Sequence, residues 1–402
     1  MSQINQGWGS GPTARYEALA ARFRPVFARI REGAVEREIG RRLPFAEIGW
    51  LKEAGFTALR LPEAEGGVGA TLPEFFNLLI ELSAADSNIT QALRAHFGFV
   101  EEAVQTTIPG RAEIWWPRIA RGETVGSARS EAGEAAQAAF DTQLQRVPDG
   151  WVINGRKFYT TGSLYADWLH VAATRVEDGV SATALVRRDA PGLTVIDDWS
   201  GFGQTLTASG TATFADVRVQ DADIVEDSTI FPYTLPFYQL VHLATLAGIG
   251  RAAADDVAQA VTRRNRGYSH ANAALPKQDP QILQVIGRVR GAAYAAGAIV
   301  LKVAEAVERV AAAPHDETAL AIAEIESAQA VGVVTTLILD ATTILFDALG
   351  ASAVLRAGSL DRYWRNARTL SSHNPRIYKD RVVGDFAVNG AAPPQSWRVG
   401  RV

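Results

Sequence analysis

Apolar residues recur every three or four positions along the first 121 residues of the chain. Phe45, Ile48 and Leu51 form one such series. This spacing puts the apolar side chains on one face of a helix with 3.6 residues per turn. We therefore expect residues 1–121 to form an α-helical N-terminal domain.

From about residue 122 the pattern changes to short runs rich in β-branched and aromatic residues, separated by Gly, Pro and Asp. Asn154-Gly155 lies between two such runs and has the composition of a two-residue hairpin turn. Further predicted strands are Trp168–Thr174, Ala182–Val186, Leu193–Ile196 and Gly210–Val219. We expect residues 122–228 to form a barrel-like antiparallel β domain.

Helical periodicity returns after residue 229 and continues to the end of the chain. One long run covers Pro280–Ala312, and a second covers Thr318–Leu349, with Gly350 as its expected C-terminal cap. Residues 229–402 are therefore predicted to form a four-helix bundle with a C-terminal tail. The fold class is α+β, with a helical, a β and a second helical domain in that order.

Composition narrows the function classes without naming one. The chain has 402 residues, 40 basic and 44 acidic, and a net charge of −4, with no basic blocks that would bind nucleic acid or an anionic membrane. It has no cysteine, which excludes disulfides and thiolate chemistry, and we expect no metal site. No signal peptide or spanning segment is predicted, so the expected location is cytoplasmic.

Six segments resemble, in order, the motifs of the acyl-CoA dehydrogenase superfamily, and together they extend over nearly the whole chain. They are Leu61–Gly67, Gly126–Gly133, Asn154–Gly162, Gly203–Val219, Arg263–Arg266 and Tyr363–Arg368. Any one of them alone is weak, because glycine turns and Asn-Gly pairs occur in many folds. The ordered set supports an acyl-CoA dehydrogenase-like fold.

The resemblance implies a flavin site and a homotetramer. In this family the flavin contacts a loop and a strand of the β domain, here represented by Ser130, Tyr159 and Thr161. Arg264 and Arg266 match the arginine that reaches a flavin phosphate, usually across a subunit boundary.

A dehydrogenase of this family needs a carboxylate beside the substrate α-carbon to remove a proton. The usual position falls on Asn374, which is no base at neutral pH. No glutamate occurs on the helix that opens the C-terminal bundle, and Asp255 and Asp256 lie too far along that helix. We therefore expect no dehydrogenase base, and Asn374 is a candidate for flavin contact.

The segment Ser371–Pro375 contains a His-Asn-Pro sequence that resembles the two-component flavin monooxygenases, especially those acting on dibenzothiophene and sulfones. This resemblance implies that His96 and His373 lie near flavin C4a, where they would support a C4a-hydroperoxyflavin that inserts one oxygen atom. Thr161 and Ser127 are expected to assist.

Three further residues are candidates for lining the substrate pocket. They are Phe97, Val100 and Trp199. A small organosulfur or heteroaromatic substrate is expected, as in desulfurization. The other histidines, His170, His242, His270 and His315, are expected to be structural.

FMN is favoured over FAD because two features of a dinucleotide site are missing. The adenine loop reads Leu349–Val354 and lacks the second glycine and the tyrosine, and Ala136 replaces a serine expected near the pyrophosphate. The chain has no nicotinamide fingerprint, so a separate NAD(P)H:flavin reductase must supply reduced flavin, with O2 as co-substrate.

Two alternatives remain open at this stage. The first is an acyl-CoA dehydrogenase-like FAD oxidoreductase with a displaced base, which an acyl-CoA would reduce directly. The second is a scaffold without catalytic activity that would retain no flavin.

Overall fold

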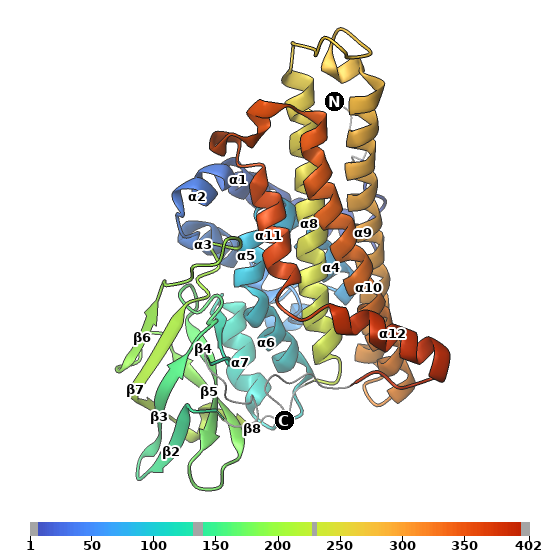
Figure 1. The fold of residues 1–402 in the computed structure, drawn as a ribbon. Helices are drawn as coiled ribbons and strands as arrows, with labels where there is room; N and C mark the ends of the chain where they lie inside the picture. The colour runs from blue at the N-terminus through green and yellow to red at the C-terminus, as the bar shows by residue number, and fades with distance from the viewer. Residues whose placement is uncertain (1–6, 132–139, 227–230, 395–402) are drawn as a thin grey trace.

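The computed structural model describes residues 7–131, 140–226 and 231–394. Seven helices form the N-terminal part and pack around a core of leucines and phenylalanines. Their bounds are α1 Tyr16–Glu32, α2 Ala34–Gly40, α3 Phe45–Glu53, α4 Leu72–Ala85, α5 Ser87–Ala92, α6 Arg94–Gln105 and α7 Arg111–Ala120. This part and the sheet lie along one side of a long helical bundle (Figure 1).

The central part is a single mixed sheet with the strand order β6-β7-β3-β2-β4-β5-β8, and β1 pairs with β4. The strands are β1 Val125–Ala128, β2 Gln143–Val147, β3 Gly150–Lys157, β4 Trp168–Arg175, β5 Ser181–Arg187, β6 Leu193–Ile196, β7 Thr211–Val219 and β8 Ile224–Glu226. Alternating residues of these strands form a second apolar core.

The sheet differs from the prediction in two respects. The pairs β1–β4 and β2–β4 are parallel, so the sheet is not purely antiparallel. Asn154-Gly155 is not a turn, because β3 runs through it and pairs with β7 across a register shift at this point. The Asn154 side chain bonds to Asp216 of β7, and the chain instead turns between Val147 and Gly150. A bulge uses the same residue pair that a hairpin turn would use.

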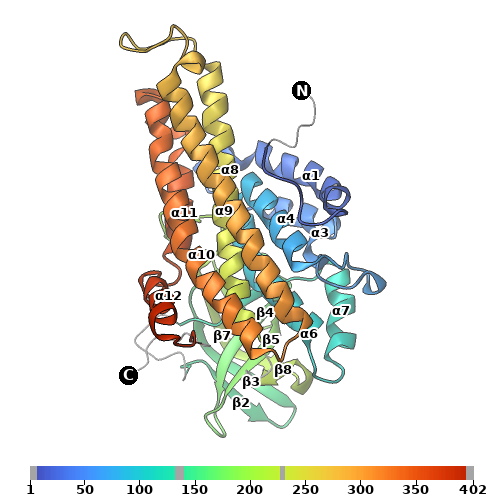
Figure 2. The same cartoon turned by 90° about the vertical axis from the view of Figure 1, so that its right-hand side faces the viewer.

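The bundle consists of α8 Thr234–Arg263, α9 Pro280–Ala312, α10 Glu317–Ile344 and α11 Asp361–Ser371 (Figure 2). Asp279 caps the start of α9 through its carboxylate, and Asp316 caps α10 in the same way. The helix α10 ends before the predicted bound, and Gly350 has φ of 162°, so this residue is extended and not a left-handed cap. The short helix α12, Ile377–Asn389, packs across α10.

One helix in the described part of the chain is long and apolar enough to span a membrane by length and composition. It comprises α10 and the turn after it, Glu317–Ala348, with 39% of its most apolar window buried within this chain. It packs against α8, α9, α11 and α12. Its apolar composition is therefore that of a bundle helix.

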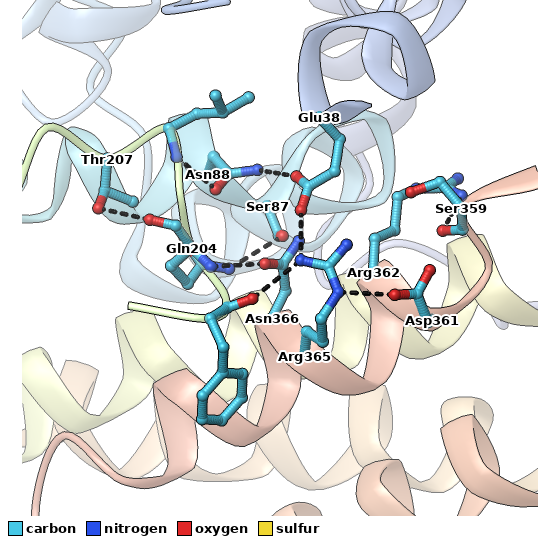
Figure 3. Close-up of polar contacts among 12 residues, drawn as sticks. Glu38, Ser87, Asn88, Gln204, Thr207, Ser359, Asp361, Arg362, Arg365 and Asn366 are labelled. Carbon is cyan, nitrogen blue, oxygen red and sulfur yellow. Dashed lines mark hydrogen bonds and ion pairs between the residues drawn. The ribbon is translucent and has the colours of Figure 1, made fainter. Parts of the chain in front are cut away.

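A network of polar side chains joins the three parts of the chain (Figure 3). Asn366 on α11 accepts a bond from the backbone N–H of Gln204 at 2.6 Å, and the Gln204 side chain donates to Ser87 at 3.1 Å. Asn88 donates to Glu38 at 3.1 Å, and Arg365 pairs with Glu38 at 3.2 Å. The network fixes the direction of α11 and with it the position of the residues that follow.

Candidate active site

The segment after β3 lies directly against the end of α5. Gly162 has φ of +79°, and a Cβ atom there would lie 2.0 Å from the Ala92 carbonyl oxygen. Only glycine fits this approach. Thr161 is therefore held close to the start of α6, two residues beyond Ala92.

Three non-glycine residues near this point have left-handed backbone conformations, which favour glycine and cost energy for other residues. They are Tyr159 at φ +59°, Gln204 at +52° and Ala208 at +49°. The Tyr159 side chain is 52% exposed and lies 6.0 Å from the Trp199 ring. Trp199 donates its indole N–H to the Gln204 carbonyl oxygen at 3.0 Å. Tyr159, predicted to contact the flavin, and Trp199, predicted to line the substrate pocket, are thus neighbours.

A chain of hydroxyl groups starts at Thr161. Its Oγ1 lies 2.7 Å from Ser209 Oγ, which lies 2.8 Å from Thr207 Oγ1. Thr207 donates to the Gln204 carbonyl oxygen at 2.9 Å. Each hydroxyl has one hydrogen, so Ser209 must donate to Thr207 and Thr161 must donate to Ser209. Thr161 can then accept a further hydrogen bond but cannot donate one.

The two candidate serines lie on neighbouring backbone. The Ser127 N–H donates to the Thr161 carbonyl oxygen at 3.2 Å, and the Ser130 carbonyl oxygen accepts from Phe158 at 2.9 Å. The Ser127 side chain is partly exposed, and none of the described residues forms a hydrogen bond with its hydroxyl. Ser127 and Thr161 thus present polar atoms side by side. Ala136, which contributed to the preference for FMN, lies outside the described residues.

His373 lies on the segment between α11 and α12, and its ring centre is 4.5 Å from that of His242 on α8. His242 is 5% exposed, and its Nε2 has no hydrogen-bond partner among the described residues. Burial and then the Arg94 guanidinium hold the pKa of His242 well below its usual value. His242 was expected to be structural, and its contact with His373 makes it a neighbour of the candidate site as well. The histidine pair was missed because the sequence does not show that the two residues meet.

His373 is an exposed residue of this chain, although neighbouring protein atoms displace part of the water around its ring. Desolvation is the largest cause that lowers the pKa of His373, and Arg94 adds to it. Asn374 Oδ1 lies 3.4 Å from His373 Nδ1. Both histidines are neutral at pH 7, so each ring can donate one hydrogen bond and accept one.

Arg94 is a charged residue that lowers the pKa of both histidines. It is the first residue of α6, and its guanidinium lies over the Tyr238 ring at 4.4 Å. Its Nε is buried without a partner, and no described residue forms a hydrogen bond or ion pair with it. Burial lowers the pKa of Arg94 to about 10. Sequence reasoning did not select Arg94, although a charged residue in a mostly apolar stretch was a usable signal.

His96 was expected near flavin C4a, but in the structure its ring is bound to backbone groups. Its Nε2 lies 2.9 Å from the Thr57 carbonyl oxygen, which can only accept, so this nitrogen carries the hydrogen. Its Nδ1 accepts from the Val125 N–H at 3.3 Å. Burial lowers the pKa of His96 to about 4. Both ring nitrogens are therefore engaged by the backbone, and His96 fastens α6 to β1.

Phe97 and Val100 were expected to line the substrate pocket, but both side chains lie in apolar cores. Phe97 packs against Phe56 and Phe75 in the N-terminal core, and Val100 lies in a separate apolar cluster with Trp115. The helix turns about 100° per residue, so the face carrying Arg94 and Gly98 is the one that meets α8. A Cβ atom on Gly98 would lie 2.0 Å from the Tyr238 hydroxyl oxygen, so glycine is needed for this contact.

Arg264 and Arg266 lie at the other end of α8. They follow His242 by more than 20 residues, which is about 33 Å along a helix. Arg264 donates to the Leu349 carbonyl oxygen at 2.8 Å, and Arg266 is exposed. Arg264 and Arg266 therefore lie far along α8 from the His242–His373 pair of the same chain.

The positions of a dehydrogenase base hold no free carboxylate in the described chain. Asp256 is bound by Arg31 and Arg362 at 2.8 Å each, and Asp255 lies 3.7 Å from Arg31. Asn374 occupies the other position. No carboxylate influences the pKa of Arg94, His242 or His373.

Residues 240–375 match the family model described as acyl-CoA dehydrogenase, C-terminal domain. This stretch comprises most of α8 to α11 and the segment with His373. Together with the helical, β and helical parts described above, the match defines an acyl-CoA dehydrogenase fold, as the sequence predicted.

Similar proteins of known name narrow the class. "Probable FMNH2-dependent monooxygenase SfnC" of Pseudomonas putida is 27% identical over 94% of this chain and 96% of that protein. The structure of TdsC from Paenibacillus sp. A11-2 with FMN and indole has a TM-score of 0.87 at 27% identity, covering 96% of this chain and 99% of TdsC. Methanesulfinate monooxygenase MsuC from Pseudomonas fluorescens has a TM-score of 0.86 at 25% identity, covering 94% and 98%. Over nearly its whole length the chain is therefore similar to monooxygenases that share this fold.

Proposed function

We propose that the protein is the oxygenase component of a two-component system that uses reduced FMN and O2 to oxygenate a small organosulfur or heteroaromatic substrate. Reduced flavin supplies two electrons, one oxygen atom of O2 enters the substrate and the other leaves as water. The observation that carries this proposal is the site around His373, which has two neutral imidazoles and an arginine but no carboxylate base.

The residues around Thr161 fit a reduced flavin. Thr161 can only accept a further hydrogen bond, because its own hydrogen is used by Ser209. A reduced flavin ring carries a hydrogen on N5, and an oxidised ring does not. Ser127, Ser130 and Tyr159 provide the adjacent polar atoms and a strained, exposed segment of backbone. We assign Thr161 to the flavin ring and Asn374 to the opposite side of the site.

His373 is proposed as the residue that holds and returns a proton at the oxygen. A neutral imidazole can donate a hydrogen bond to a developing oxyanion, and such donors contribute about 10²-fold to a rate. His242 lies behind His373 and is a positioning residue. His96 is assigned a structural role, because both of its nitrogens are bound to backbone.

The protein is expected to act in the cytoplasm as a homotetramer, with an NAD(P)H:flavin reductase delivering reduced FMN. The tetramer is supported by Arg264 and Arg266, because they lie about 33 Å along the helix direction from His242 and would reach a flavin phosphate in another subunit.

The test combines the protein, FMN, NADH and a flavin reductase under ¹⁸O2 with a panel of organosulfur compounds and indole. Incorporation of one ¹⁸O atom per product supports the proposal. The alternative, an acyl-CoA dehydrogenase-like FAD enzyme, predicts anaerobic bleaching of bound flavin by an acyl-CoA without a reductase. That result, or stronger retention of FAD than of FMN, would contradict the proposal.

A further inference from the structure

A small cavity lies beside His242, where α8, α10, α11 and α12 meet. Its apolar walls come from α8, α10 and α11, and its polar lining includes His242, Asn374 and Lys379. The volume open to the centre of a water molecule is about 20 Å³. One water molecule needs about 10 to 15 Å³ on this measure. The cavity therefore has room for one water molecule and for little more.

His242 is the one residue lining this cavity whose buried polar atom lacks a partner in the described parts of the chain. The residue is 5% exposed, and the unpartnered atom is Nε2 of its ring. Buried polar atoms are normally satisfied by protein groups or by ordered water. His96 shows the contrast, because it is equally buried and both of its ring nitrogens are bound to backbone groups. The open nitrogen of His242 and the cavity beside it thus favour a water molecule at this place.

The charged residues that line the cavity can donate hydrogen bonds but cannot accept them. They are Lys379, which is buried on α12, and Arg376, which precedes α12 and donates to Thr336 at 3.3 Å. Burial lowers the pKa of Lys379, and the buried carboxylate of Glu324 on α10 opposes this shift. A water molecule held by Lys379 must accept from the ammonium group. Both hydrogens of that water then remain to be donated.

We propose that the cavity is a site for one water molecule, which accepts from Lys379 and donates to His242 Nε2. Because Nε2 is then an acceptor, the hydrogen of the neutral ring is on Nδ1. Asn374 also lines the cavity, and its Oδ1 lies 3.4 Å from His373 Nδ1. Lys379 is thus a positioning residue for the oxygenation, because it fixes the ring against which His373 packs. This role rests on the proposed function, whereas the water site does not.

The hydrogen on His242 can be located by NMR of the FMN-loaded protein with ¹⁵N-labelled histidine, without substrate or turnover. The spectrum is recorded at about pH 8, one unit above the pKa of about 7 that burial gives Glu324. Protonated and unprotonated ring nitrogens differ in chemical shift, and His242→Gln identifies the signals of this residue. We expect the hydrogen on Nδ1 in the wild type.

Two variants remove the water in different ways. Lys379→Met combined with Glu324→Gln removes both charges of the buried pair, and the hydrogen on His242 should then shift to Nε2 or become shared between the two nitrogens. Val331→Leu should have the same effect, because its added methylene group fills the cavity and leaves the lysine in place. Lys302→Met changes an exposed lysine of α9 and is the matched control, which should leave the spectrum unchanged.

A wild-type His242 with its hydrogen on Nε2 would overturn the water site, because a small anion in the cavity can only accept and requires that form. A wild-type spectrum in both variants would overturn it as well. The positioning role is measured separately, with FMN, NADH, the reductase and O2. The double variant should raise hydrogen peroxide relative to oxygenated product by about three- to tenfold, the effect of losing one hydrogen bond. An unchanged ratio would overturn the positioning role. If the wild type forms no oxygenated product, the proposed function fails and the spectrum alone decides on the water site.

Discussion

An unpaired cation beside the site should make the ligand-free protein less stable, and replacing it with an apolar residue of similar length should therefore stabilise the fold. Burial lowers the pKa of Arg94 from 12.5 to about 10. At about 1.4 kcal/mol per pKa unit, this corresponds to about 3 kcal/mol of disfavoured charge. The cation–π contact with the Tyr238 ring at 4.4 Å stabilises the charged side chain by roughly 0.5 to 2 kcal/mol. We expect Arg94→Met to raise the free energy of unfolding by about 1 to 2 kcal/mol.

The effect of Arg94 on the free energy of unfolding changes with pH in one direction. The folded-state pKa of Arg94 lies below the unfolded value, so the cost of the charge is fully present below about pH 10 and is relieved only as the pH rises above it. The difference in free energy of unfolding between Arg94→Met and the wild type should therefore be constant between about pH 6 and about pH 9.

Thermal and urea denaturation of the ligand-free protein measure the effect, which should appear as a rise of a few degrees in Tm. Arg37→Met is the contrasting variant. Arg37 is paired with Glu47 and Asp86, and Glu47 also pairs with Arg42. Loss of Arg37 therefore leaves the buried Asp86 without a cation and should destabilise by about 3 to 5 kcal/mol. If Arg94→Met also destabilises the ligand-free protein, the arginine is a structural residue and the reasoning fails.

Three other variants test the remaining parts of the site. His373→Ala should lower the yield of oxygenated product by about 10²-fold while the yield of hydrogen peroxide rises. The exposed control His315→Ala should leave both yields unchanged. If His373→Ala also leaves them unchanged, His373 is structural. Ser209→Ala frees the hydrogen of Thr161 and should lower the two-electron potential of bound FMN by about 20 mV, equivalent to about 1 kcal/mol; a potential that does not move would show that the hydroxyl chain has no influence on the flavin. Arg264→Ala should weaken FMN retention by about 1.5 to 3 kcal/mol if it reaches a phosphate in another subunit, and equal affinity would limit it to its contact with Leu349.

The long helices and most of the strands could be predicted because their signals are local. The bounds of α9 agree with the predicted range, since Asp279 and Pro280 mark its start. The Asn154-Gly155 turn was predicted wrongly, because a bulge and a hairpin turn share the same local sequence and only the pairing with β7 decides between them. The parallel pairs of β1 and β2 with β4 depend on contacts between distant segments, which no local pattern contains.

For the site, motif resemblance identifies candidate segments but not the side-chain directions within them. Ser127 and Thr161 are joined through their backbone, and His373 contacts His242. His96 and Arg94 are two residues apart on α6, yet one faces backbone and the other faces α8. His242 joins His373 only through the packing of α8 against α11. A rotation of about 100° per residue decides such roles, and it cannot be fixed before the helix has a partner.

The polar network in Figure 3 has a consequence for the order of folding during synthesis. Glu38 and Asn88 are buried, Glu38 pairs with the partly exposed Arg365, and the Gln204 backbone is bound by Asn366. The early part of the chain therefore has partners near its end. Domains usually begin to fold from the N-terminus as the chain emerges from the ribosome. Here the first 210 residues cannot complete their hydrogen bonds until α11 has been made. In a nascent chain shorter than about 370 residues, these groups should therefore remain hydrated until the last helices are released.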